Sequence, residues 1–196
     1  MKESGEIAAE KARLRERFQA ARLAMPPAVR ARASRAICER VLALPEIDAI
    51  GHGRVALFWP RVDRAEVDVR PLADALRSRG ATTVLPRITG PGQLTWHDWH
   101  GEPLVEGRWG VCEPAATALR ADPTDLAAII IPGLAFGADG TRLGWGGGYY
   151  DRALGRGGVA IGVTFDVALV GALPEGPYDR RVGIVVSETR VAGPDA

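Results

Sequence analysis

The chain has 196 residues, of which 46% are hydrophobic and 25% charged, and its 25 basic and 24 acidic side chains give a formal net charge of +1. This length supports one well-buried core, so we expect a single domain over residues 1–196. The balanced charge gives no reason to expect nucleic acid or an anionic membrane as a partner, so any anion site must be local.

The cysteines and the N-terminus predict a cytoplasmic protein. Cys38 and Cys112 lie far apart without paired spacing, which argues against a disulfide framework or a zinc site. Residues 1–18 are a charged helix former rather than a signal peptide, and no apolar run approaches the roughly 20 residues that a membrane helix needs.

The chain is predicted to begin with a helical hairpin. Residues 6–24 lack glycine and proline and place Leu14 and Phe18 on one apolar stripe, which predicts an amphipathic helix. Two prolines end this helix, and a second helix is expected over residues 28–43.

A parallel sheet is predicted beyond the hairpin. Residues 54–60 and 82–88 are short β-rich runs on either side of a helical pattern at 69–80, which favours a right-handed parallel βαβ unit. Residues 94–99 alternate like an edge strand, while 126–136 are apolar throughout and suit a central strand that is buried on both faces. Further elements are expected as a helix at 149–154 and strands at 158–165 and 182–188. The predicted fold is an α/β three-layer sandwich with a mostly parallel sheet.

The segment GTRLGWGGGYYDRALGRGG, residues 140–158, places four glycines in a five-residue window. A Walker phosphate loop requires Lys and then Ser or Thr after its last glycine, and Tyr149 and Tyr150 follow here, so that interpretation is excluded. A dinucleotide fingerprint has the right separation of Gly144 and Gly146 and an acidic residue, Asp166, about twenty residues on. However, bulky Tyr149 fills the third position, where the fingerprint has a small residue. About ten residues also separate the preceding strand from Gly144, where the fingerprint has a tight turn.

A more general anion site remains possible at these glycines. Free backbone amides that lead into a helix can bind phosphate, and Arg142 can add a charge-assisted hydrogen bond. Asp151 in the first helical turn either caps the helix or holds magnesium. From the glycines alone, an ordinary flexible loop is an equal alternative.

The motif PGLAFGADGTRLGWGGGYYDR, residues 132–152, resembles the signature of the 5-formyltetrahydrofolate cyclo-ligase family. Weaker similarities occur in the same order at Lys11, Leu14 and Arg15, at FWPRVDRAEVDVRPL, at WGVCEP (109–114) and at LPEGPYDRRVGIVVSE. Gly147 stands where some members have lysine, and Tyr178 stands where histidine is frequent. The resemblance covers nearly the whole chain.

The resemblance implies an ATP- and Mg²⁺-dependent ligase that converts 5-formyltetrahydrofolate to 5,10-methenyltetrahydrofolate, releasing ADP and phosphate. Positioning and charge neutralisation perform most of such a phosphoryl transfer, so no Ser/His or Cys/His motif is needed. The expected partners are small molecules, and the expected oligomeric state is a monomer or weak dimer. Two alternatives remain: a paralogue acting on another folate or phosphorylated substrate, and a non-catalytic protein that binds folate or nucleotide.

The resemblance also implies roles for individual residues. Arg142, Tyr149 and Asp151 are implied to be catalytic, and Asp151 and Asp179 are implied to bind Mg²⁺. Glu66, Trp145, Gly148 and Tyr149 would contact the folate. The residues implied to bind ATP are Lys11, Arg15, Arg142, Gly144, Trp145, Gly146, Gly147, Gly148, Tyr149 and Tyr150.

Several of these residues have ordinary interpretations when each is considered alone. Lys11 and Arg15 are four apart on a helix and would suit a solvated face, and Glu66 would suit a loop. His97 and His100, which alternate with tryptophans, are predicted to serve packing and surface exposure rather than a metal. Cys112 is predicted to be a small residue in a turn.

Overall fold

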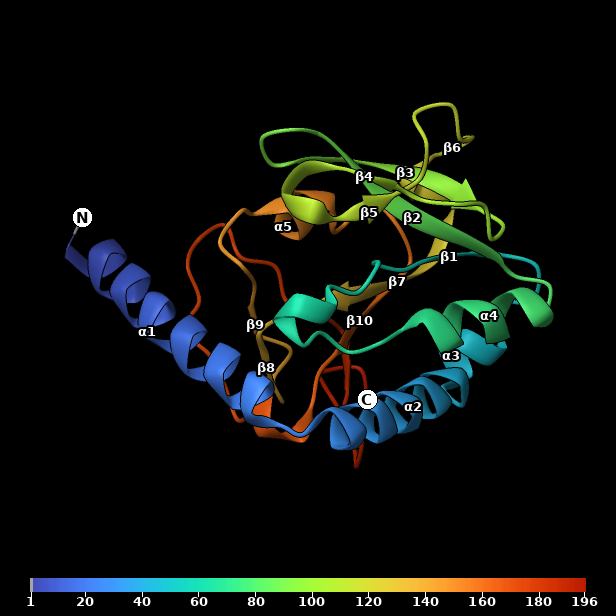
Figure 1. Ribbon diagram of the computed structural model, residues 1–196. Coiled ribbons are helices and arrows are strands. Elements are labelled where there is room, and N and C mark those ends of the chain that lie inside the picture. Colours follow the sequence, from blue (N-terminus) through green and yellow to red (C-terminus); the bar gives the residue numbers. More distant parts are fainter. Residues whose placement is uncertain (1) are drawn as a thin grey trace.

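The computed structural model describes residues 2–196, and the chain begins with the two predicted helices, α1 (Lys2–Ala24) and α2 (Pro27–Leu42). Pro27 occupies the first turn of α2, where its missing N–H has no intrahelical partner to lose. The helices diverge at the connecting turn instead of lying side by side (Figure 1). On α1, Leu14 and Phe18 pack against Leu134 and Leu143, whereas α2 packs against α4 (Arg70–Ser78).

The other elements are short. The remaining helices are α3 (Pro45–Asp48) and α5 (Tyr149–Ala153). The large sheet has the spatial order β13 (Val191–Ala192), β12 (Ile184–Val186), β10 (Val159–Val163), β7 (Leu126–Pro132), β1 (Arg54–Ala56), β2 (Thr82–Gly90), β3 (Gln93–Trp99), β6 (Arg120–Ala121). Two smaller sheets contain β11 (Leu169–Val170), β8 (Ala135–Gly137) and β9 (Arg142–Leu143), and β4 (Val105–Glu106) with β5 (Cys112–Glu113). Among residues 2–196, no helix combines the length and apolar character of a membrane-spanning segment.

The large sheet is parallel at its centre and antiparallel at its edges. The five strands from β12 to β2 are parallel to one another, while β13, β3 and β6 pair in the antiparallel sense. The expectation of an edge strand at residues 94–99 is wrong, because β6 pairs with the outer side of β3. The predicted βαβ unit is confirmed, because β1 pairs in parallel with β2 and α4 lies between them in the chain. The predicted α/β fold with a mostly parallel sheet is therefore present.

Strand β7 shows how the sheet is buried on both faces. Ala128 and Ile130 belong to the core on the α2 and α4 side, whereas Ile129 and Ile131 belong to the core on the opposite side. This alternation follows from the two-residue period of a strand. The core on this second side includes Phe136 of β8, Leu154 just after α5 and Leu169 of β11, and no described residue of the long helices contributes to it.

The apolar run at residues 126–136, predicted as one strand, is in fact two. β7 ends at Pro132, and β8 belongs to a separate three-stranded sheet. Proline lacks the N–H that would continue the ladder. At Gly133 a Cβ would lie 2.5 Å from the Phe136 ring, so the chain requires glycine at this turn. The run therefore supplies a central strand and then a turn toward β9.

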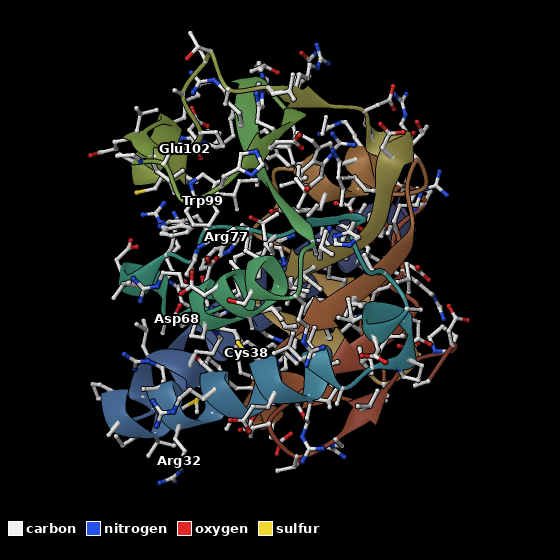
Figure 2. The ribbon with its side chains drawn as sticks, turned by 90° about the vertical axis from the view of Figure 1, so that its right-hand side faces the viewer. Arg32, Cys38, Asp68, Arg77, Trp99 and Glu102 are labelled. Atoms are coloured by element: carbon white, nitrogen blue, oxygen red, sulfur yellow. The ribbon has the colours of Figure 1, made fainter. Side chains whose placement is uncertain are left out.

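Cys38 provides a test of the packing around α2. Figure 2 shows it on α2 below the loop that carries Asp68, and its Sγ donates a hydrogen bond to the Asp68 carbonyl at 3.4 Å. Burial raises the pKa of the Cys38 thiol to about 11, so roughly one molecule in 10³ carries the thiolate at pH 8. We expect a thiol-specific disulfide reagent to modify half-buried Cys112 in the native protein and Cys38 only after denaturation. Rapid modification of both thiols in the native protein would contradict this packing.

Candidate functional site

A cleft of about 1210 Å³ opens beyond the carboxyl ends of β1 and β7, and Pro86 of β2 also lines it. β1 and β7 are neighbours in the sheet. From β1 the chain continues to β2 on one side, whereas from β7 it continues to β10 on the other side, so the loops after β1 and β7 diverge. Open parallel sheets bind ligands at such a switch point. The volume exceeds the about 300–1,000 Å³ that is typical of a site for one ligand, so the cleft has room for two substrates.

The glycine-rich segment forms one wall of this cleft. Gly146 and Gly148 have φ angles of 95° and 64°, in the left-handed region that glycine adopts without strain. The Gly144 carbonyl accepts a hydrogen bond from Arg15 Nε at 2.9 Å. The Gly148 carbonyl accepts one from Arg152 Nη1, also at 2.9 Å. The segment is thus hydrogen-bonded near both ends, and it leads into α5, at the position predicted for a helix.

Basic side chains dominate one end of the cleft. Lys11 and Arg15 reach it from α1, and Arg142 reaches it from β9. Eight basic and three acidic side chains line the cleft, although the whole chain has a net charge of only +1. The cleft therefore carries a local excess of positive charge, which an anion site in a nearly neutral chain needs.

Arg142 and Asp151 form a close pair at the base of this end. Arg142 Nη2 donates to Asp151 Oδ1 at 2.6 Å, and the two side chains are 5% and 19% exposed. Arg142 Nε is buried without a hydrogen-bond partner among the described residues. The Arg142 guanidinium also lies against Gly144, where a Cβ would be 2.8 Å from Nη1.

Lys11 and Asp179 form a second pair. Lys11 Nζ donates to Asp179 Oδ2, which also accepts a hydrogen bond from the Gly176 N–H at 2.5 Å. Burial raises the pKa of Asp179, but the hydrogen bonds from Lys11 and Gly176 outweigh it, and the net pKa is below the ordinary value. Asp179 is therefore ionised at neutral pH.

The two carboxylates implied as magnesium ligands fit a metal that arrives with phosphates. Asp151 Oδ1 also accepts from the Arg180 N–H at 3.3 Å, whereas Asp151 Oδ2 and Asp179 Oδ1 accept no hydrogen bond from the side chains of residues 5–196 or from the described backbone. Among the side chains of residues 5–196, no group of three or more His, Cys, Asp or Glu could hold a metal alone. Magnesium is commonly bound by one or two carboxylates together with substrate phosphates, which is what this donor set offers.

The other end of the cleft is built around Trp145 and Glu66. Trp145 Nε1 donates to Glu66 Oε1 at 3.1 Å, and Glu66 Oε2 accepts from the Arg61 N–H at 2.9 Å. The Arg64 guanidinium lies 4.2 Å from the centre of the Trp145 ring, within the range of a cation–π contact. These contacts fix the direction of the Glu66 carboxylate and of the indole.

The two adjacent tyrosines have different surroundings. Tyr149 packs edge-on against Trp109, with ring centres 5.8 Å apart, at the cleft lining. Trp109 is 55% exposed and has a φ of 57°, an uncommon conformation for a bulky residue. Tyr150 packs against Trp96 in the core, and burial raises the pKa of its phenol.

Every site residue implied by the sequence lines the same cleft. Their individual roles stay predictions. Sequence reasoning assigned no role to Trp59, Arg64 or Trp109, which also line it. Trp59 ends the run predicted as the first strand and packs against Trp99 with ring centres 5.2 Å apart. The Arg77 guanidinium, labelled beside Trp99 in Figure 2, lies 4.4 Å from the centre of the Trp99 ring. WGVCEP was the only sequence signal at Trp109.

His97 and His100 lie outside the cleft lining. Both ring nitrogens of buried His97 have partners, the Ala118 carbonyl at 2.9 Å and Thr95 Oγ1 at 3.0 Å. His100 is exposed. These positions agree with packing and surface exposure as the interpretation of the two histidines.

The fold and the cleft together define an α/β protein with a large site at the switch point of its sheet, lined by glycines, by basic side chains and by aromatic rings. The sequence model of the 5-formyltetrahydrofolate cyclo-ligase family matches residues 7–188. The chain belongs to this family.

Individual relatives agree with the family match. A Schizosaccharomyces pombe protein named probable 5-formyltetrahydrofolate cyclo-ligase is 32% identical over 124 residues, which are 61% of this chain and 59% of that protein. The 5-formyltetrahydrofolate cyclo-ligase of Mycolicibacterium smegmatis is 32% identical over 128 residues, 61% of this chain and 66% of that one. These matches thus span less than two thirds of either curated relative. The NMR structure of Aquifex aeolicus 5,10-methenyltetrahydrofolate synthetase has a TM-score of 0.82 at 31% identity, covering 93% of this chain and 92% of that one.

Proposed function

We propose that this chain, acting as one domain, converts 5-formyltetrahydrofolate to 5,10-methenyltetrahydrofolate with ATP and Mg²⁺. The observation that carries the proposal is that Gly144 and Trp145, which are neighbours in the chain, bind two different kinds of side chain in the cleft, the cation of Arg15 and the carboxylate of Glu66. The Gly144 carbonyl binds Arg15 at the cationic end, while the Trp145 indole binds Glu66 at the aromatic end. One segment would therefore contact both a phosphate-type and a flat heterocyclic ligand.

The proposed reaction has two steps. The formyl oxygen attacks the γ-phosphorus of ATP, the bond from that phosphorus to the bridging oxygen breaks, and ADP leaves. The N10 lone pair then attacks the activated formyl carbon, the carbon–oxygen bond breaks, and phosphate leaves with the former formyl oxygen. Loss of the N10 proton gives the methenyl cation. The first step turns a poor leaving group into a good one.

The residues of the cationic end are suited to the first step because phosphoryl transfer depends mainly on positioning and charge neutralisation. Lys11, Arg15 and Arg142 would bind the phosphate oxygens together with the amides of residues 144–150. Asp151 and Asp179 would hold Mg²⁺, which would supply further neutralisation of phosphate charge. Asp151 also holds the Arg142 guanidinium at 2.6 Å and so fixes its direction.

The residues of the aromatic end are suited to the folate. Glu66 accepts hydrogen bonds from Trp145 and Arg61, which leaves its remaining lone pairs for the N–H groups of a pterin. Trp145 and Tyr149 offer ring faces to the flat heterocycle, and Gly148 allows close approach of the backbone. This arrangement would place the formyl group between the two ends of the cleft.

An absorbance assay for methenyltetrahydrofolate tests the proposal. We expect product only when 5-formyltetrahydrofolate, ATP and Mg²⁺ are all present, with one ADP formed per product. Tight folate binding without turnover would indicate a binding protein, and ATP consumption with only a different folate or phosphorylated substrate would indicate a paralogue. Either result would exclude the proposed reaction.

A further inference from the structure

Arg22, near the end of α1, is a buried cation that the proposed reaction does not use. Its side chain is bound only to backbone carbonyl groups. Nε and Nη2 donate to the Ala65 carbonyl at 2.9 and 2.8 Å, Nη2 also donates to Arg64 O at 3.2 Å, and Nη1 donates to Gly133 O at 2.8 Å. The residue is 2% exposed, and no carboxylate of the described side chains forms an ion pair with it. Burial lowers the pKa of Arg22 to about 10, so the guanidinium is still charged at neutral pH.

The carbonyl groups bound by Arg22 belong to the two loops that diverge at the switch point. Ala65 lies in the loop after β1 and directly precedes Glu66. Its φ of 49° is in the left-handed region, so surrounding contacts must hold this peptide in place. Gly133 directly follows β7 and Pro132, whose carbonyl accepts a hydrogen bond from Arg142 at 3.5 Å. One guanidinium thus connects the loop of Glu66 to the start of the segment that leads to the glycines.

Arg22 also connects these loops to the cationic end. Lys11, Arg15, Phe18 and Arg22 are spaced at i, i+4, i+7 and i+11, and therefore share one face of α1. Phe18 is 2% exposed and packs beside Leu134 and Leu143, which holds this face against the body of the protein. The same helix face therefore presents Lys11 and Arg15 to the cleft and Arg22 to the Glu66 loop.

We propose that Arg22 is a positioning residue that sets the place of Glu66, and with it the folate end of the cleft, relative to the α1 cations. This inference rests on the proposed function. A buried charge costs free energy unless it is hydrogen-bonded, and all three nitrogens of the Arg22 guanidinium bind carbonyl groups of these two loops. The planar fork of arginine can bind two separate loops at once, whereas an ammonium group lacks that geometry.

The test compares Arg22→Met and Arg22→Lys with the matched control Arg13→Met. Arg13 lies on the same helix, where its exposed side chain binds Glu10. The readouts are the Kd of 5-formyltetrahydrofolate from tryptophan fluorescence without ATP, the KM of each substrate, and the Tm. We expect both Arg22 variants to raise the folate Kd and KM by at least about 10-fold, since small misplacements at a reacting site have large effects. The ATP KM should change by less than about threefold in Arg22→Met, and Arg13→Met should match the wild type.

A lowered Tm with an unchanged folate Kd, measured well below that Tm, would overturn the inference. Arg22→Gln serves as a second variant if Arg22→Met and Arg22→Lys do not fold, because its single side-chain amide can donate to the Ala65 carbonyl or to the Gly133 carbonyl but cannot join the two loops as the guanidinium does. We expect a smaller rise of the folate Kd in that variant, and an unchanged value there would also overturn the inference. Failure of the wild type to form methenyltetrahydrofolate would instead count against the proposed function.

Discussion

Asp151→Asn is expected to lower turnover by about 10²-fold or more while the Kd of 5-formyltetrahydrofolate stays within about twofold. The carboxylate lies 2.6 Å from the Arg142 guanidinium and makes no hydrogen bond to Trp145 or Glu66, which bind each other. Asparagine has nearly the same shape but lacks the charge that orients Arg142 and that would bind magnesium. The concentration of Mg²⁺ needed for half-maximal activity should therefore rise. Steady-state rates over a range of Mg²⁺ concentrations measure both effects.

Asp74→Asn is the matched control for this substitution. Asp74 also pairs with an arginine, Arg77, but its side chain is 70% exposed on α4, outside the cleft lining. Its kinetics should equal those of the wild type. Removing one partner of the less exposed Arg142–Asp151 pair can cost up to about 3 kcal/mol of stability, so the Tm of each variant must be measured as well. Loss of folate binding in folded Asp151→Asn would make Asp151 a structural residue or a substrate contact.

Trp145→Phe is expected to weaken folate binding with little effect on ATP. Phenylalanine keeps an aromatic face beside Arg64 but removes the Nε1–H that donates to Glu66 at 3.1 Å. A hydrogen bond to a charged group contributes about 1.5–3 kcal/mol, which corresponds to a roughly 10- to 150-fold rise in the folate Kd. Trp145→Ala should raise it further because the ring is lost too. Titration of tryptophan fluorescence with folate, and the ATP KM, provide the measurements.

A double-mutant cycle with Glu66→Gln tests whether Trp145 acts through Glu66. If it does, the Trp145→Phe and Glu66→Gln effects on the folate Kd should be clearly less than additive. Fully additive effects would mean that the two residues contribute separately. An unchanged folate Kd in folded Trp145→Phe would remove Trp145 from the folate site.

Local patterns predicted most of the fold. The helical periodicity of α1 and α2 and the strand–helix–strand order around α4 are signals within short windows, and the structure confirms these elements. The division of residues 126–136 depends instead on tertiary packing at Gly133, where the Phe136 ring returns across the chain. The divergence of the first two helices likewise depends on the small sheet against which α1 packs. Such contacts join distant segments and leave no local periodicity.

The candidate site was predictable where a continuous motif carried it. Residues 142–151 form one recognisable segment of the family motif. Lys11, Arg15 and Glu66 were assigned to the site through the family resemblance, since their own spacing did not indicate it. Arg22 had no such signal, because one of its partners, Gly133, is 111 residues away. In a chain with 25 lysines and arginines, a further arginine on a basic helix resembles a solvated one. Arg64 likewise had no local signal, because the ring that it contacts belongs to Trp145 in the distant glycine segment.

The most direct test of the account follows the formyl oxygen. The 5-formyltetrahydrofolate is prepared with a heavy oxygen isotope in its formyl group and is converted with ATP and Mg²⁺. The released phosphate is then analysed by mass spectrometry. If the cleft brings the formyl group to the γ-phosphate, one phosphate should be released for each methenyltetrahydrofolate formed. Each of these phosphates should carry one heavy oxygen. Unlabelled phosphate accompanying full product formation would contradict the proposed joining of the two ends of the cleft in one reaction.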